Sequence, residues 1–413
     1  MSDTQAQPKP VWRTPMVVLA AGAMVILLVF GLRASFGLFL TPISVELGTG
    51  REVFAFAMAV QNLLWGAGQP FASAVAEKWG AGRVIVLGGL LYAGGIALMG
   101  YATDPLTLNL SAGIMIGMAQ AASGLAVVLG AVARALPPER RTWGLGVVTA
   151  AGALGQCTVV PGIQGLMTAG MEWLPALMIL AASALIMLVC AVALAGKPDP
   201  EAAAETVAGA NPGLMAALRQ ASGHRDYWLL TLGFFVCGFH VAFITVHMPS
   251  YLMDLGFDAQ WGAWSLAIIG FFNIIGSYTA GSLGDKYRKK NLLAYLYIAR
   301  AFVIIAFISL PVTAVSVLLF SAAMGLLWLS TVPLTSGLVA YMFGPRYMGT
   351  LFGIVFFSHQ VGSFLGVWLG GYFYDTTGSY DPIWWAGIVV GFGAALVHWP
   401  IRENLSGTQP KTA

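Results

Sequence analysis

The stretch GSLGDKYRK, at residues 281–289, is a short basic turn between two long apolar runs. A weaker copy, SAVAEKWGAGR at residues 73–83, stands about half a chain earlier, between the second and third apolar runs. The same kind of turn after the second run and again after the eighth indicates a duplicated unit of six helices. The chain is therefore predicted to consist of two related halves.

The composition is typical of a protein whose main solvent is lipid. Apolar residues make up 58% of the 413 residues, and charged residues only 9%. A soluble domain carries about 25% charged residues, so charge this sparse cannot cover a surface that faces water. The 51 glycines exceed the usual share of ~7% and suit helices that pack closely in a bilayer. Gly362, Gly366 and Gly370, spaced four residues apart, predict one such close contact.

Twelve apolar runs are long enough to cross a bilayer as helices, which takes about 20 residues. We expect an all-α membrane protein with twelve transmembrane helices in two six-helix pseudo-symmetric halves. The halves are predicted at residues 1–196 and 227–413, with a polar cytoplasmic linker at 197–226. The twelve runs are 15–43, 53–76, 84–102, 106–133, 143–168, 173–196, 227–252, 260–282, 291–310, 312–342, 348–372 and 382–401.

Lysine and arginine are concentrated in alternate loops, which predicts the orientation of the chain. Basic loops stay in the cytoplasm, so we expect both termini there and the protein in the plasma (inner) membrane. Arg51 is then the one basic residue of the outer loops, and Arg33 and Arg300 lie within spans. Seventeen of the 20 basic residues fall on the cytoplasmic side: Lys9, Arg13, Lys78, Arg83, Arg134, Arg140, Arg141, Lys197, Arg219, Arg225, Lys286, Arg288, Lys289, Lys290, Arg346, Arg402 and Lys411.

Several classes of function are disfavoured. The chain has no Gly-rich phosphate loop of the Walker type and no long soluble segment that could bind ATP. If the chain transports a solute, the energy for that transport must then come from a gradient. No nucleophile–base pair or metal-ligand spacing appears at a shared depth in the spans, so we expect no enzyme, no cofactor, no metal site and no nucleic-acid partner. Cys157, Cys190 and Cys237 fall inside apolar runs and are interpreted as packing residues.

The two basic turns have a physical use. An acid at the end of one helix can meet the N-terminus of a neighbouring helix or an arginine, and so hold two helices together in one conformation. We interpret Asp285, Lys286 and Arg288 as such a gating motif, with Glu77 and Arg83 in the first copy. The alternative is a solvated loop that only obeys the positive-inside bias.

These features resemble the major facilitator superfamily. The turn at residues 281–288 matches that family's loop signature closely, whereas the first copy has Ser73 where Gly is usual and Glu77 in place of Asp. Within the superfamily, the chain is similar to the monocarboxylate transporter and oxalate–formate antiporter branch. The stretches that carry this second likeness are residues 69–70, 134–141, 343–347 and 371–380.

The resemblance implies a substrate near the midplane of the membrane, between the halves. Arg33 lies in the first span with no acidic residue one turn away. An arginine at mid-span costs roughly 2.5–3.5 kcal/mol on insertion scales, so its presence needs a reason. We expect Arg33 to face a wet cavity and bind a substrate carboxylate; the alternative is a salt bridge or carbonyl contact within the bundle. Arg300, on a peripheral helix, is expected to be structural.

Histidines are the titratable candidates within the spans. His359 stands where the oxalate–formate antiporter resemblance places a substrate-binding lysine, and its charge would depend on pH. Its alternative role is a hydrogen bond to a neighbouring helix. His240, near the midplane, and His247, near the outer mouth, share one face of the seventh span. Either one is a candidate for proton coupling, and both can equally be structural.

The eighth span departs from the family pattern. Carboxylate-transporting relatives place an arginine in its middle, where this chain has Ser277, with Asn273 one turn earlier. Without a second fixed cation there, the pattern favours a monoanion over a dicarboxylate. No Asp or Glu occurs in the central part of any span, so a proton must be carried by histidine or by the substrate. Asn273 and Gln120 are candidate hydrogen-bonding residues, with interhelical contact as the alternative for Gln120.

Together these patterns predict a secondary active transporter that moves a small organic anion, with a monocarboxylate and proton symport favoured. Substrate binding is assigned to Arg33, His359, His240, Asn273 and Gln120. Two alternatives remain: an exporter of amphipathic, drug-like compounds and an anion exchanger. We expect a monomer whose partners are the organic anion, the coupling proton and the lipid bilayer.

Overall fold

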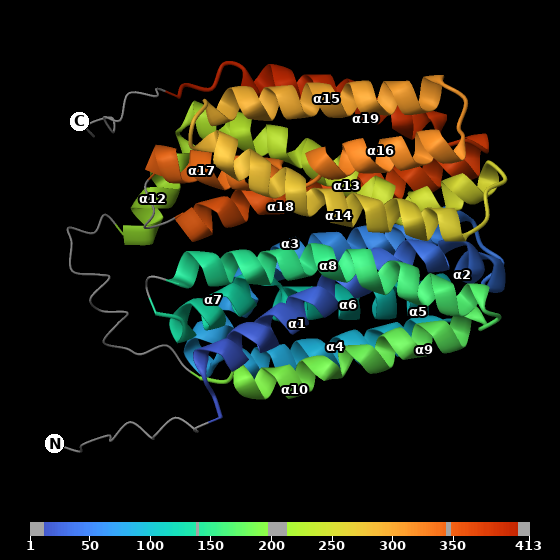
Figure 1. Cartoon of the computed structure of the whole chain (residues 1–413), viewed down its shortest axis with the longest axis horizontal. Coiled ribbons are helices and arrows are strands. Elements are labelled where there is room, and N and C mark those ends of the chain that lie inside the picture. The colour runs from blue at the N-terminus through green and yellow to red at the C-terminus, as the bar shows by residue number, and fades with distance from the viewer. Residues whose placement is uncertain (1–11, 138–139, 197–212, 344–347, 404–413) are drawn as a thin grey trace.

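The computed structural model describes residues 12–137, 140–196, 213–343 and 348–403. Within these ranges the regular secondary structure is entirely helical, as the sequence predicts. The helices run side by side in two layers, with both described ends of the chain at the same end of the bundle (Figure 1). We call this the proximal end and the opposite one the distal end.

The N-terminal half contains the first six spans, three of which are interrupted. The first span passes through a 3-10 turn, the fourth through a wide π-type segment and then a break at Gly124, and the sixth through a bend at Leu185. The elements are α1 (Pro15–Ser35), η1 (Phe36–Phe39) and α2 (Leu40–Glu46); α3 (Arg51–Trp79); α4 (Ala81–Gly100); α5 (Pro105–Leu108), η2 (Asn109–Met115), α6 (Ile116–Ser123) and α7 (Leu125–Ala135); α8 (Arg141–Thr168); and α9 (Trp173–Ala184) with α10 (Ile186–Ala193).

The C-terminal half repeats this plan. Its fourth span is broken between α16 and α17, at the position that corresponds to the break between α6 and α7. The short helix α12 (Gly213–Ser222) precedes the six spans of this half, and residues 197–212 of the predicted linker lie outside the described part. The elements are α13 (Arg225–Asp254), α14 (Gln260–Gly284), α15 (Lys289–Ser309), α16 (Ala314–Leu327) with α17 (Thr331–Phe343), α18 (Met348–Thr377) and α19 (Asp381–His398).

Eleven of the spans in the described part are both long and apolar enough to cross a membrane. The twelfth, α3, has 29 residues but is less apolar. Its polar side chains explain this: it begins with Arg51 and Glu52 and carries Gln61 and Asn62 at its centre. These side chains face the other half and the core of its own half, as described below, so α3 remains a spanning helix.

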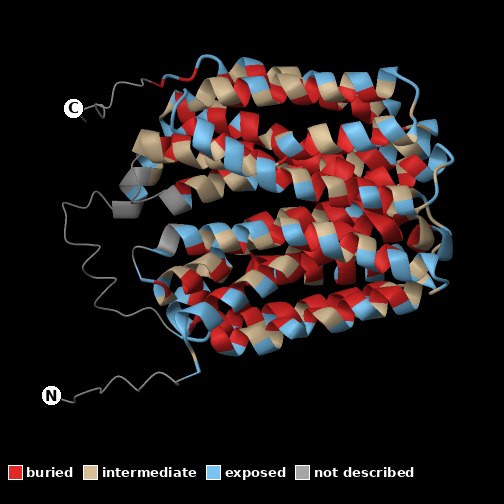
Figure 2. Ribbon diagram, viewed as in Figure 1, coloured by how far each residue is buried: buried red, intermediate tan, exposed pale blue. Residues whose placement is uncertain are grey.

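The halves meet along two pairs of helices, α3 against α18 and α8 against α14 (Figure 1). In a duplicated fold these pairs are related, because α3 corresponds to α14 and α8 to α18. Buried residues concentrate inside each half and along this seam, whereas exposed residues lie on the outer helix faces (Figure 2). Many exposed side chains are large and apolar, such as Leu87, Val189 and Phe302, as expected of helices that face lipid.

The basic turns take the places that the sequence predicts. The stretch 281–289 spans the end of α14 and the start of α15, and the first copy joins α3 to α4. The junction between α3 and α4 turns within one residue, Gly80, whose φ of +96° is rarely adopted by residues with a side chain.

The glycine series of α18 packs against α13, which confirms the predicted close contact. A Cβ at Gly362 would overlap the carbonyl of Phe235, and one at Gly366 the carbonyl of Phe239. The backbones of the two helices therefore touch directly, as small residues allow within a membrane.

We predict that Gly362→Ala destabilises the protein by about 1–3 kcal/mol, because the added methyl group forces α18 away from α13. Gly353→Ala, on the same helix, is the matched control, since no atom lies within 4 Å of a Cβ built there. The control should be unchanged or up to ~1 kcal/mol more stable, because alanine favours helix. Thermal unfolding in detergent measures both, and equal midpoints for the two variants would contradict the packing described here.

Candidate functional site

A polar cluster around Arg33 lies where α1, α3 and α4 meet beside the seam between the halves. Arg33 sits near the end of α1, and its Nη2 donates a hydrogen bond to Asn62 Oδ1 of α3 at 2.7 Å. Its guanidinium lies over the ring of Trp65, with Cζ 5.2 Å from the centroid. Within the described part no carboxylate pairs with Arg33, so its positive charge is not neutralised there.

Gln120 belongs to the layer behind Arg33. Its Nε2 donates to Gln61 Oε1 at 3.0 Å and to the Tyr92 hydroxyl at 3.2 Å, and Tyr92 in turn donates to the Val29 carbonyl at 3.1 Å. These bonds connect α6, α3, α4 and α1. The contacts observed for Gln120 are therefore the interhelical ones that the sequence left as its alternative role.

Three buried donors near the seam have no hydrogen-bond partner in the described part: Arg33 Nε, Trp65 Nε1 and Gln360 Nε2. Gln360, on α18, packs against Gly66 of α3, one residue from Trp65. An unpaired buried donor costs about 1–3 kcal/mol, so each of these groups is one that an added acceptor would stabilise.

Aromatic rings line the seam next to these donors. Phe30 and Trp65 of the first half contact edge to face, with centroids 5.9 Å apart. Trp65 contacts Phe356 of α18 in the same manner at 5.4 Å, across the two halves. These three rings form an apolar row beside the unpaired donors.

His359 lies on α18 at the end of this aromatic row. Its ring stacks on Phe356 at 5.6 Å, and its Nδ1 is 3.0 Å from Gln360 Oε1. The side chain is buried, and it also hydrogen-bonds to the thiol of Cys237 and lies 5.0 Å from the ring of Phe234, both on α13. His359 therefore shares a wall with the donors around Arg33, although it belongs to the other half.

Asn273 and Arg300 together satisfy the broken fourth span of the C-terminal half. Asn273 Oδ1 accepts the backbone N–H of Leu329 at 3.0 Å. Arg300 is fully buried and donates to the carbonyls of Leu327 and Trp328. Irregular backbone at this depth must find partners inside the protein. Arg300 thus has the structural role predicted for it, and the observed contacts give Asn273 a similar one.

His240 faces away from the seam. Its Nε2 is 2.8 Å from the carbonyl of Gly387 on α19, and Gly391 lies against the same ring. The ring is almost completely buried between α13 and α19. This placement separates His240 from Arg33 and His359, so the structure does not bring the five predicted binding residues together in one site.

The predicted gating residues occupy the proximal turns. Glu77 lies in the last turn of α3 and Arg83 in the first turn of α4, while Asp285, Lys286 and Arg288 lie between α14 and α15. Between described residues their side chains form no hydrogen bond or ion pair. The predicted latch is therefore not formed among these residues in this conformation, and their gating role stays a prediction.

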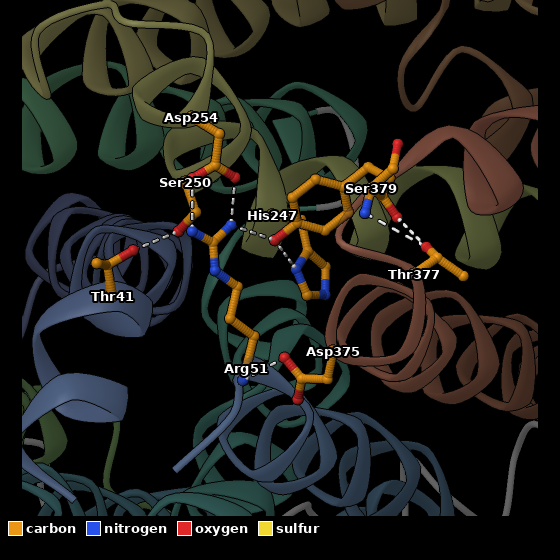
Figure 3. Close-up of polar contacts among 9 residues, drawn as sticks. Thr41, Arg51, His247, Ser250, Asp254, Asp375, Thr377 and Ser379 are labelled. Atoms are coloured by element: carbon orange, nitrogen blue, oxygen red, sulfur yellow. Dashed lines mark hydrogen bonds and ion pairs between the residues drawn. The ribbon is translucent and has the colours of Figure 1, made fainter. Parts of the chain in front are cut away.

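A latch does exist at the distal end, where the two halves are held together by Arg51 (Figure 3). Both of its terminal nitrogens bind the carboxylate of Asp254, at 2.6 and 2.7 Å, and Nη1 also donates to the Tyr380 hydroxyl at 3.0 Å. The guanidinium packs on the ring of Tyr374 at 3.8 Å. A bidentate pair of this kind is strong and directional. It joins α3 of one half to α13 of the other.

A second carboxylate completes this distal gate. Asp375, near the end of α18, accepts the backbone N–H groups of Arg51 and Glu52 at 2.9 and 2.7 Å. It thereby caps the first turn of α3, where a negative charge is stabilised by the helix dipole. Glu52 in turn accepts the indole N–H of Trp368 at 2.9 Å.

The remaining polar contacts between described residues of the two halves lie at the distal end or at the middle of the seam. The hydroxyls of Thr41 and Ser250 are 3.0 Å apart beside the gate (Figure 3), and Gln156 Nε2 donates to the Leu266 carbonyl at 3.0 Å. The distal end is therefore closed by direct contacts in this conformation.

The variant Thr41→Cys/Ser250→Cys tests whether this gate opens during function. Because the two hydroxyls touch, we expect the introduced thiols to form a disulfide and to abolish transport, with activity restored by reduction. Cross-linking on gels and uptake into proteoliposomes measure the two effects. Each single cysteine variant is the control. A cross-linked protein that transports at the full rate would show that the gate need not open.

The distal gate was missed in the sequence, although one signal was visible. Arg51 is the one basic residue that the predicted orientation leaves in the outer loops, among several acids. A cation there against the positive-inside bias is a candidate for an ion pair. Gln360 carried no such signal, because a buried amide in an apolar helix has many possible partners.

The fold has two six-helix halves with paired broken spans. The seam between them carries an arginine with no carboxylate partner in the described part, and a gate closes it at one end. This combination is typical of a secondary transporter for small molecules. Comparison with known proteins gives the family. The profile of the Major Facilitator Superfamily matches residues 22–367, and the chain belongs to this family.

Sequence relatives narrow the likeness. Monocarboxylate transporter 13 of Rattus norvegicus is 26% identical over 406 residues, with 96% of this chain and 92% of the relative covered. Monocarboxylate transporter 12 of the same organism is 26% identical, covering 82% and 76%. The uncharacterized MFS-type transporter YcxA of Bacillus subtilis (strain 168) is 24% identical, covering 90% and 91%.

Solved structures confirm the fold. The xylose transporter XylE from E. coli, in an inward open conformation, superposes with a TM-score of 0.74 at 13% identity and covers 96% and 98% of the two chains. A bacterial homolog of the human lysosomal transporter Spinster, inward-facing and occupied, gives 0.73 at 14% identity, covering 95% and 97%.

Proposed function

We propose that this protein carries a small monovalent organic acid across the membrane by alternating access, in symport with a proton. The observation that carries the proposal is the guanidinium of Arg33, which lies beside the seam with no carboxylate partner in the described part. A charge in that position is stabilised when an anionic substrate binds.

Arg33, Trp65 and Gln360 would form the binding site, with His359 in its wall. Their unpaired donors suit the oxygens of one carboxylate, and the rings of Phe30 and Phe356 suit an apolar body. Arg300 does not act as a second binding cation in this proposal, because its Nε and Nη2 already donate to the carbonyls of the broken span. The names of the monocarboxylate transporter relatives support the same class of substrate.

The orientation completes the proposal. The positive-inside pattern puts the proximal end in the cytoplasm, so the distal gate around Arg51 closes the outer side of the plasma (inner) membrane. Opening this gate and closing the proximal end would expose the Arg33 site to the outside. The gating motifs at residues 73–83 and 281–289 would then hold the proximal end shut.

The replacement Arg33→Gln tests the proposal. Loss of one charged hydrogen-bonding partner in a desolvated site costs about 2–5 kcal/mol, so we expect saturable uptake of the preferred acid to fall by about 100-fold in kcat/KM. Arg33→Lys should keep part of the activity, because it retains the charge without the planar fork. Uptake of a panel of labelled monocarboxylates into proteoliposomes, with and without an inward proton gradient, measures this.

Arg219→Gln is the matched control, since Arg219 is exposed on α12 and distant in sequence from every span of the N-terminal half. The proposal would be refuted if no acid in the panel showed saturable uptake, or if Arg33→Gln transported its acid like the unmodified protein. Uptake that needs a second acid on the opposite side, and ignores the proton gradient, would indicate exchange instead of symport.

A further inference from the structure

His247 lies directly beneath the distal gate and is connected to its arginine by one hydroxyl. Its Nδ1 is 3.1 Å from the Tyr380 hydroxyl, which also receives the hydrogen bond from Arg51 (Figure 3). Its Nε2 is 2.8 Å from the carbonyl of Val367 on α18. The side chain is 1% exposed, so both ring nitrogens are committed to protein partners.

The directions of these hydrogen bonds follow from the chemistry of the partners. A carbonyl only accepts, so Nε2 must carry a hydrogen and donate it to Val367. Arg51 only donates, so the Tyr380 oxygen must accept from it. Burial raises the pKa of the Tyr380 hydroxyl above its ordinary value, so this group keeps its own hydrogen. That hydrogen points to Nδ1 of His247, which can accept it only when the imidazole is neutral.

We infer that Nδ1 of His247 is a proton-binding site that is empty when the distal gate is closed and filled from outside when the gate opens. This inference rests on the proposed alternating access and adds to it the residue through which external acidity acts on the gate.

A proton on Nδ1 is incompatible with the closed gate for two reasons. First, it turns Nδ1 into a donor that faces the Tyr380 hydroxyl, whose own hydrogen then has no acceptor. Second, it places a positive charge on the ring, which is separated from the charge of Arg51 by that hydroxyl alone. The acids of the gate do not offset this charge by direct contact, because Asp254 holds the arginine from its other side and Asp375 caps α3. The remaining titratable groups of the gate are phenols and two acids with no bond to the ring: Tyr251, Tyr374, Glu52 and Asp381.

Opening the gate removes both obstacles. When α3 and α13 separate, Arg51 leaves Tyr380, and water can reach the ring. An imidazole in water titrates near pH 6.5. A proton that binds the open state and is excluded from the closed one shifts the equilibrium between them. Lowering the pH from 7.5 to 5.5 should then raise the ratio of open to closed gate by about tenfold.

Spin labels at the distal end measure this ratio directly. Val45, at the end of α2, and Gln260, at the start of α14, are both exposed and uncharged and belong to different halves. Nitroxides on cysteines at these positions, with the three native cysteines replaced by serine, report the gate as a distance distribution by pulsed electron resonance. The measurement needs no substrate, so it is independent of whether the proposed cargo is right.

We expect the ratio of the longer-distance to the shorter-distance population to grow by about tenfold between pH 7.5 and pH 5.5, and to be independent of pH in His247→Gln. Glutamine offers the same acceptor to Tyr380 and the same donor to Val367 but does not titrate. His240→Gln is the matched control, because His240 lies on the same helix without any connection to the gate, and it should keep the full response.

Three results would overturn the inference: no pH response in the unmodified gate, an equal response in His247→Gln, or loss of the response in His240→Gln alone. If His247→Gln does not fold, His247→Asn takes its place. Failure of acid uptake with a normal response of the gate would refute the proposed cargo and leave the proton site intact.

Discussion

Hydrogen-bond satisfaction within the bilayer is the constraint on which the structure depends. A lipid-facing chain must form helices, and any break in a helix needs polar partners from elsewhere in the protein. The break between α16 and α17 obeys this rule, because Arg300 binds its free carbonyls and Asn273 its free N–H. Arg33, Trp65 and Gln360 also carry buried donors without a partner in the described part. They differ from other such groups because they lie beside the seam, next to a cation that no carboxylate neutralises there.

The contacts at the distal gate between the halves differ in kind from the packing inside each half. The distal gate relies on a few charged contacts between halves, centred on Arg51, whereas the close packing inside each half relies on glycine. Charged contacts can be exchanged for water without a change in either half, but the backbone contact between α13 and α18 cannot. The halves are therefore suited to move as rigid bodies about the seam.

The twelve spans, the duplication and the turns were predictable because lipid imposes a length and an apolar composition on each helix. Arg33 was recognisable as a candidate as well, since a charge at mid-span is costly wherever its side chain points, and its role in binding stays a prediction. Arg300 looked peripheral by the position of its helix, and its structural role followed. The sequence did not reveal that His240 faces α19 while His247 meets Tyr380, because residues seven apart on one helix can still contact different neighbours.

The amino-acid sequence alone indicates how many times this chain crosses the membrane and that its core holds charges in need of partners, and it predicts an orientation through the positive-inside rule. Which groups these charges pair with is decided only by the folded arrangement of the two halves. Asp254 and Tyr380 are 203 and 329 residues away from Arg51. Local periodicity carries no information over such separations, whereas the meeting of α3, α13 and α18 at one end of the seam brings these groups within hydrogen-bonding distance.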